Sequence, residues 1–340
     1  MEIDSAYISV ESSIGDNFEF TAGIRQEDGL QQVNTYDLFS GVDSVIDKSI
    51  EEDYQLPSMT LTYLPEFDEN LQIRFGASQT IARPTFRELS PTLFIDVDTD
   101  RVIAGSLYLE NSEIDNIDLR LEYYLGFNQF FTAGIFSKEI LKPIEETVNE
   151  SGDLIITSYQ NVPLAEINGF EIEYEQLFEA IMDSPNDLLV KFNYTQTESE
   201  VIVNPGDTYI NSLGTLVDAQ NLLANGRDTR LQGQSDTIAN LQIGLDNLQN
   251  QTQATLIVNY VSDRVRARGI DVLPDIIEEP PLLVDFAFSK IYSYPKYELK
   301  VSFELRNLLD EEYYASMRNI AIYDQYNLGT SASLGFKVSF

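Results

Sequence analysis

The sequence predicts an all-β fold. About thirteen strands form the wall of a transmembrane, antiparallel, up-and-down β-barrel. Three observations predict it. Polar and apolar residues alternate with a period of two over segments of about ten residues. Almost no segment shows a helical period, and short and long connections alternate along the chain. Each strand of this kind places one face in an apolar medium and the other in a polar one.

The strands follow from this alternation in chain order, and the last one shows it over the greatest length. One face of that strand carries Leu328, Thr330, Ala332, Leu334, Phe336, Val338 and Phe340. The predicted strands are 2–12, 18–27, 55–64, 71–82, 116–125, 130–140, 166–176, 187–197, 235–245, 252–263, 281–292, 296–307 and 326–340.

The side of the wall on which each residue lies is fixed by register, because a slip of one residue would turn charges towards lipid. We expect one set of apolar residues to face outwards: Ile73, Leu119, Leu121, Leu241, Ile243, Val301 and Leu334. We expect a polar set to face inwards: Arg74, Arg120, Glu173, Asn240 and Lys300.

The connections between these strands also favour a membrane barrel. Long structureless loops argue against a compact soluble domain, whereas alternating short and long links are typical of a barrel with short turns at its periplasmic rim. We expect the long connections to project from one rim: 28–54, 83–115, 198–234 and 308–325. A soluble propeller or sandwich is the alternative, but the repeat of about 40–50 residues expected of a propeller is not seen.

Composition excludes several function classes. The chain of 340 residues has 21 Lys and Arg against 56 Asp and Glu, a formal charge of −35, which opposes nucleic-acid binding. It has neither Cys nor His, so cysteine nucleophiles, Ser–His pairs and zinc sites are excluded. We therefore expect no enzyme activity and no cofactor, and any metal would be a hard cation bound by oxygen.

Several short motifs occur in an order and spacing that cover nearly the whole chain. They are Leu56-Pro57-Ser58, Arg83-Pro84-Thr85-Phe86-Arg87-Glu88-Leu89-Ser90-Pro91, Asn116-Ile117-Asp118-Leu119-Arg120-Leu121-Glu122-Tyr123-Tyr124, Phe136-Ser137-Lys138, Lys142-Pro143-Ile144-Glu145, Asn168-Gly169-Phe170-Glu171-Ile172-Glu173, Leu231-Gln232-Gly233-Gln234-Ser235, Asn307-Leu308-Leu309-Asp310 and the terminal Phe340. With these motifs the chain resembles the β-barrel of TonB-dependent outer-membrane receptors.

The resemblance implies a bacterial outer-membrane receptor with a plugged barrel of about 22 strands. Residues 1–340 would be its C-terminal barrel portion, without the plug domain and the first barrel strands. An odd number of strands agrees, and it predicts an open, curved sheet with both outer strands unpaired on one side. The implied partners are outer-membrane lipid, the TonB complex through the missing N-terminal region, and an extracellular small-molecule or oligosaccharide ligand. A passive porin-like channel is the alternative function.

Candidate ligand-binding residues are inward cations and aromatic residues of the outer loops: Arg74, Arg83, Arg87, Arg120, Tyr108 and Tyr159. The cations could bind an anionic ligand or the plug, or pair with carboxylates inside a wet barrel, and Glu173 has Lys191 as a predicted partner of this kind. The tyrosines could stack on a sugar or chelate ring or pack within loops. Asp96, Asp98 and Asp100 are spaced like the start of a calcium loop, but Arg101 and Leu107 replace its glycine and closing glutamate.

Overall fold

A computed structural model of the chain describes residues 1–36, 45–96, 101–126, 129–151, 154–179, 185–212, 214–223, 227–247, 249–270, 273–318 and 320–340. Its main feature is a 13-stranded sheet, which we call the wall. The wall strands are β1 (Glu2–Ile14), β2 (Phe18–Tyr36), β3 (Val45–Tyr63), β4 (Leu71–Ala82), β7 (Ser112–Gly126), β8 (Gln129–Leu141), β11 (Leu164–Phe178), β12 (Asp187–Ile202), β15 (Thr237–Asn247), β16 (Thr252–Val261), β19 (Leu283–Tyr294), β20 (Tyr297–Arg306) and β23 (Ser331–Ser339).

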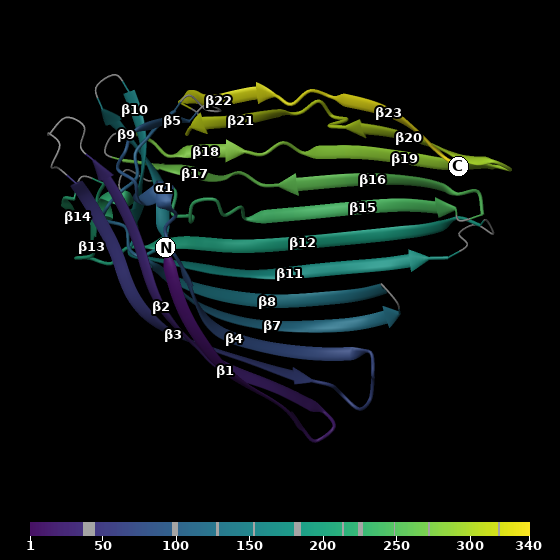
Figure 1. Cartoon of the computed structure of the whole chain (residues 1–340), viewed down its shortest axis with the longest axis horizontal. Coiled ribbons are helices and arrows are strands. Elements are labelled where there is room, and N and C mark those ends of the chain that lie inside the picture. Colours follow the sequence, from purple (N-terminus) through teal and green to yellow (C-terminus); the bar gives the residue numbers. More distant parts are fainter. Residues whose placement is uncertain are drawn as a thin grey trace.

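The wall is an antiparallel meander in which each strand pairs with the next wall strand along the chain. Its order runs from β1 at one edge to β23 at the other (Figure 1). Over the described residues no ladder joins β1 to β23, so the sheet is open, as predicted. Each of the thirteen predicted strands corresponds to one wall strand.

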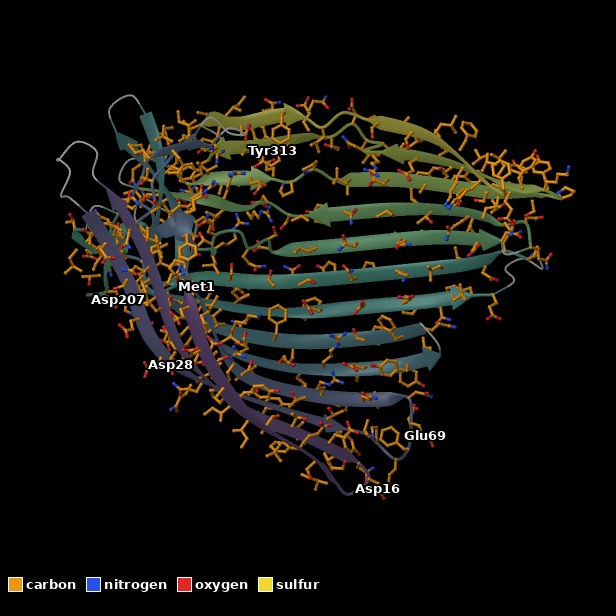
Figure 2. The ribbon with its side chains drawn as sticks, in the orientation of Figure 1. Met1, Asp16, Asp28, Glu69, Asp207 and Tyr313 are labelled. Atoms are coloured by element: carbon orange, nitrogen blue, oxygen red, sulfur yellow. The ribbon has the colours of Figure 1, made fainter. Side chains whose placement is uncertain are left out.

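The two rims of the wall differ, as the alternating connections predict. Tight turns such as Gly15–Asn17 lie at one end, which we call the turn rim. The long connections lie at the opposite end, the loop rim. Figure 2 shows Asp16 and Glu69 at the turn rim, whereas Asp28 and Asp207 lie towards the loop rim.

The long connections contain more strand than the sequence predicts. The prediction of a loop over 28–54 is wrong at both ends, because β2 continues to Tyr36 and β3 starts at Val45. In these extensions both faces carry polar residues, so the apolar contrast that marks a strand in the sequence is lost while the backbone ladder continues.

A second sheet of eight strands forms at the loop rim, in the order β22-β21-β18-β17-β9-β10-β6-β5. Its strands are β5 (Phe94–Asp96), β6 (Arg101–Ile103), β9 (Ile144–Ser151), β10 (Leu154–Asn161), β17 (Arg264–Gly269), β18 (Ile276–Glu279), β21 (Glu312–Met317) and β22 (Ala321–Asn327). Most of them continue wall strands after a short break, as β9 continues β8 beyond Lys142 and Pro143. The expectation of structureless long loops is therefore wrong.

Smaller elements complete the loop rim. The connection after β4 contains the short helix α1 (Phe86–Leu89), and the connection after β12 contains the hairpin β13 (Thr208–Ile210) and β14 (Leu216–Asp218) and the turn η2 (Ala219–Leu222). Within the described residues, no helix has the length and apolar character needed to cross a membrane.

The two faces of the wall differ in chemistry, and the register confirms that the two predicted sets lie on opposite faces. Arg74 lies opposite Arg120, and Glu173 lies opposite Asn193, which pairs with Asn240. We call this side the charged face. The other side, the apolar face, keeps large side chains exposed, with Leu334 63% and Ile135 59% exposed.

The apolar face ends towards the loop rim in a row of carboxylates. Asp115 of β7 lies opposite Glu139 of β8, which lies opposite Glu166 of β11, which in turn lies opposite Glu200 of β12. We call these four residues the acidic row. Like charges that face each other directly across strands are destabilising.

Candidate functional site

The charged face carries an ion-pair network centred on Glu122 of β7. This carboxylate is only 5% exposed and lies 3.6 Å from Arg74 Nη1 and 3.4 Å from Arg120 Nε. Arg120 also lies 3.4 Å from Glu173 of β11. Glu122 thus separates two guanidinium groups that lie directly opposite each other, and the structure brings the predicted residues Arg74 and Arg120 together here.

The predicted pairing of Glu173 with Lys191 is wrong. Lys191 Nζ lies 2.9 Å from Glu175 Oε1, because register places these two residues directly opposite each other. Glu173 lies opposite Asn193 instead, and its carboxylate forms an ion pair with Arg120.

The connection after β4 packs against the charged face of β2 and β3. Arg83 Nη2 lies 2.8 Å from Glu27 Oε2, and Gln31 donates to the backbone carbonyl of Pro84. Thr85 and Glu88 form a capping box that starts α1, and Leu89 at its end is fully buried. These contacts hold the connection after β4 against β2 and β3.

Leu89 belongs to a small core that also contains the predicted residue Tyr159. Ile50, Leu89 and Leu109 are buried together, and Tyr159 of β10 packs against them. Nearby, Arg87 lies over the ring of Phe94, with Cζ 4.5 Å from the ring centroid.

Tyr108 lies apart from these residues, in a groove of about 400 Å³ shared with Tyr209 and the Glu110–Lys142 ion pair. It packs on Gly214, where an added Cβ would lie 2.4 Å from the ring, and the positive φ of Gly214 (+77°) also favours glycine. The six predicted ligand-binding residues therefore occupy three separate places.

Three segments meet at a junction that sequence reasoning missed. Arg268 of β17 and Glu145 of β9 are both fully buried and form a bidentate ion pair, with Nη2 2.8 Å from Oε1. Arg268 also donates to the carbonyls of Asp228 and Arg230. Gln232 connects the same strands, since its side chain accepts from the amide of Glu146 and donates to the carbonyl of Arg266.

Two of the sequence motifs, those around Pro143 and Gln232, supply residues to this junction. It brings β9 beside β17, although the wall strands that they continue, β8 and β16, are separated by β11, β12 and β15. The β9–β10 hairpin therefore lies across the outer ends of these three strands and covers part of the loop rim.

An ion cluster beside the junction fixes the segment before β15. Arg230 lies within 3.4 Å of the carboxylates of Asp228, Asp236 and Asp263. Burial opposes ionisation of Asp228, but the hydrogen bonds from Arg230 outweigh it and hold the pKa of Asp228 below its usual value of 3.8.

The predicted metal site is only partly within the described residues. Asp96 ends β5, whereas Asp98 and Asp100 lie outside the described residues. Among the described residues, no group of three or more acidic side chains is arranged to hold a metal ion. The calcium site thus stays a prediction.

Comparison with known proteins identifies the family. Residues 2–308 match the family described as TonB dependent receptor-like, beta-barrel. The chain belongs to the TonB-dependent receptor β-barrel family. A comparison with curated proteins gave no match.

Solved structures of TonB-dependent receptors share the fold. The siderophore receptor PiuA from Acinetobacter baumannii has a TM-score of 0.66 and 15% identity, and the match covers 98% of this chain and 43% of that one. The ferric-catecholate import receptor Fiu from Escherichia coli K12 has a TM-score of 0.63 and 13% identity, and the match covers 99% of this chain and 45% of that one. The ferric yersiniabactin uptake receptor FyuA from Yersinia pestis has a TM-score of 0.61 and 13% identity, and the match covers 99% of this chain and 45% of that one. The chain thus spans less than half the length of each receptor, and the family and these neighbours are receptors and transporters, not enzymes.

Proposed function

We propose that this chain forms part of the barrel wall of an outer-membrane receptor, which binds a scarce nutrient outside the cell and imports it with energy delivered through TonB. The observation that carries the proposal is the family match over residues 2–308, together with a wall that is apolar on one face and charged on the other. In this arrangement the apolar face contacts lipid and the charged face lines the lumen.

The loop rim supports a nutrient that is captured from outside the cell. The covered rim, with its Tyr108 groove and ion-paired loops, suits a ligand held from outside before passage, such as a siderophore or a glycan fragment. Siderophore uptake has the additional support that PiuA, Fiu and FyuA, which share the fold, are named for it.

The test is uptake by the intact receptor in its host. We expect deletion of its gene to abolish uptake of one labelled ferric siderophore or oligosaccharide, and deletion of tonB to have the same effect. A porin-like channel would behave differently, since liposomes with the purified protein would pass small sugars and uptake in cells would not depend on tonB. That result would contradict the proposal.

A further inference from the structure

Three of the long connections meet at the groove beside Tyr108. One side comes from the segment before β7, one from the two ends of the β9–β10 hairpin, and one from the β13–β14 hairpin. Figure 1 shows the β13–β14 hairpin at the loop rim. The groove has a volume of about 400 Å³. Small-molecule sites usually have volumes of about 300–1,000 Å³, so the groove has the size of such a site.

One side of the groove is apolar and exposed. Ile210 of β13 lies directly opposite Leu216 of β14, and these side chains are 41% and 66% exposed. Tyr108 is 43% exposed and lies against Gly214 in the turn of the same hairpin. The hairpin is anchored through Tyr209, which is buried in a core on its other face. Exposed apolar side chains that lie together with polar groups at their border are typical of a binding surface.

The other side of the groove carries an ion pair that one asparagine holds in place. Lys142 and Glu110 form this pair, and both side chains are about half exposed. Asn161 Nδ2 donates to the backbone carbonyls of Lys142 at 2.7 Å and Glu110 at 3.1 Å. Its Oδ1 accepts from the amide of Glu110 at 2.9 Å. The backbone on both sides of the pair is therefore fixed before a ligand arrives, which lowers the entropic cost of binding.

Tyr108 is also held by the chain around it. The amides of Gly105 and Ser106 donate to backbone carbonyls of the segment around α1, at 2.8 and 2.6 Å. On the other side of Tyr108, Leu109 is fully buried in the core that contains Leu89. The aromatic ring and the ion pair are thus both positioned by anchored segments.

The charges of the groove disfavour an anionic ligand. Among the described residues that line it, Glu110 and Lys142 carry opposite charges and the others are neutral. Asp218 lies directly opposite Thr208 at the edge of the groove and adds a negative charge. The whole chain has a formal charge of −35. An anion such as a ferric catecholate complex would therefore meet repulsion that the lining residues do not offset.

A neutral sugar has the chemistry that this groove can bind. One face of a pyranose ring consists of C–H groups, which stack on an aromatic ring such as Tyr108. The sugar hydroxyls both donate and accept hydrogen bonds. Lys142 supplies donors and Glu110 supplies acceptors at adjacent positions, so the pair can bind two neighbouring hydroxyls of one ring.

We propose that the Tyr108 groove binds a neutral oligosaccharide, with one sugar ring stacked on Tyr108 and its hydroxyls bound by Glu110 and Lys142. This site rests on the proposed function and narrows it, because it selects a glycan fragment over a ferric siderophore as the captured nutrient. The receptors named for siderophores share the fold at 13–15% identity, which does not set the ligand of this groove.

The experiment uses the intact receptor in detergent. An array of neutral oligosaccharides built from glucose, mannose, galactose, xylose or N-acetylglucosamine is screened for binding. Calorimetry then gives the Kd of the tightest ligand and that of ferric 2,3-dihydroxybenzoate, the anionic probe. We expect saturable binding of at least one neutral oligosaccharide and at least tenfold weaker binding of the ferric complex.

Variants locate the binding in the groove. Tyr108→Ala should raise the Kd of the oligosaccharide at least tenfold, whereas Tyr108→Phe keeps the ring and should change it less than threefold. Lys142→Gln should raise the Kd at least fivefold without lowering the temperature of thermal unfolding, because an exposed ion pair contributes little to stability. The matched controls are Tyr294→Ala, at a tyrosine that is 47% exposed at the turn rim, and Arg306→Gln, in an exposed ion pair outside the groove; both should keep the Kd within twofold.

The results separate this site from the proposed function. The sugar site is wrong if no neutral oligosaccharide binds saturably, if the ferric complex binds more tightly, or if Tyr108→Ala binds as well as the wild type. None of these results would contradict TonB-dependent uptake of another nutrient. If the oligosaccharide binds in the groove but cells without tonB take it up equally well, the site is confirmed and the proposed function is contradicted.

Discussion

Arg268 and Glu145, which are 123 residues apart in the chain, form a fully buried, bidentate ion pair that ties β17 to β9. No local pattern in the sequence predicts this contact. The pair is satisfied on all sides by backbone groups of the segment that precedes β15, so its three segments depend on one another.

Loss of one partner of this pair should open the loop rim. Arg268→Met leaves Glu145 buried without a counter-ion, which we expect to cost about 3–5 kcal/mol. The measurement is limited proteolysis of the 227–236 segment together with urea unfolding of the intact receptor. The double variant Arg268→Met with Glu145→Leu should recover most of the loss. Arg306→Met, which removes an exposed partner of Glu304, is the control and should change stability by about 1 kcal/mol at most. Unchanged proteolysis in Arg268→Met would contradict this prediction.

Neutralising one member of the acidic row should stabilise the wall. Glu166 lies between Glu139 and Glu200 and has a like charge directly opposite on both sides, so we expect Glu166→Gln to add about 0.2–1 kcal/mol. Glu173→Gln is a matched control on the same strand, since it removes the same charge but loses the contact with Arg120 and should destabilise. Urea unfolding at low salt measures both. The idea fails if the two variants shift stability in the same direction.

Acidic pH should loosen the segment around Asp228, whereas a change of pH near neutrality should have no effect on it. Its pKa in the folded protein is below 3.8, so the carboxylate stabilises the fold above its unfolded pKa and this contribution is lost as pH falls through the folded value. We therefore expect protease sensitivity of the segment to rise only below about pH 4. Asp228→Asn should remove the pH dependence and be sensitive at all pH values. A wild-type transition near pH 6 would rule out Asp228 as its cause.

The assignment of the apolar face to lipid can be tested at two adjacent residues. Leu241 lies on the apolar face and Gln242 on the charged face of β15. For the receptor in a bilayer, we expect Leu241→Arg to cost about 2–4 kcal/mol and Gln242→Arg to cost much less, because water reaches the charged face. Equal costs in urea unfolding from lipid vesicles would show that the two faces meet the same medium.

The wall could be predicted from the sequence, and the loop rim could not, for a physical reason. The wall strands have one apolar and one charged face, so their period of two is visible in single segments such as Leu71–Ala82. β17 reads Arg264-Val265-Arg266-Ala267-Arg268-Gly269, where arginines mark contacts with other loops and not a surface exposed to water. Pairs such as Glu175 with Lys191 depend on register, and an error of two residues in a predicted strand suffices to choose the wrong glutamate.

The order of strands in the wall also has a consequence for assembly. Neighbouring wall strands follow one another along the chain, so the wall can form by adding one hairpin at a time, with low loop-closure entropy at the short turns. The parallel contact of β9 with β17 cannot form until the strands from β8 to β16 stand side by side. We therefore expect this contact to form after the wall strands from β8 to β16 have paired, and a wall with an unclosed rim to accumulate as an intermediate whenever the Arg268–Glu145 contact is slow to form.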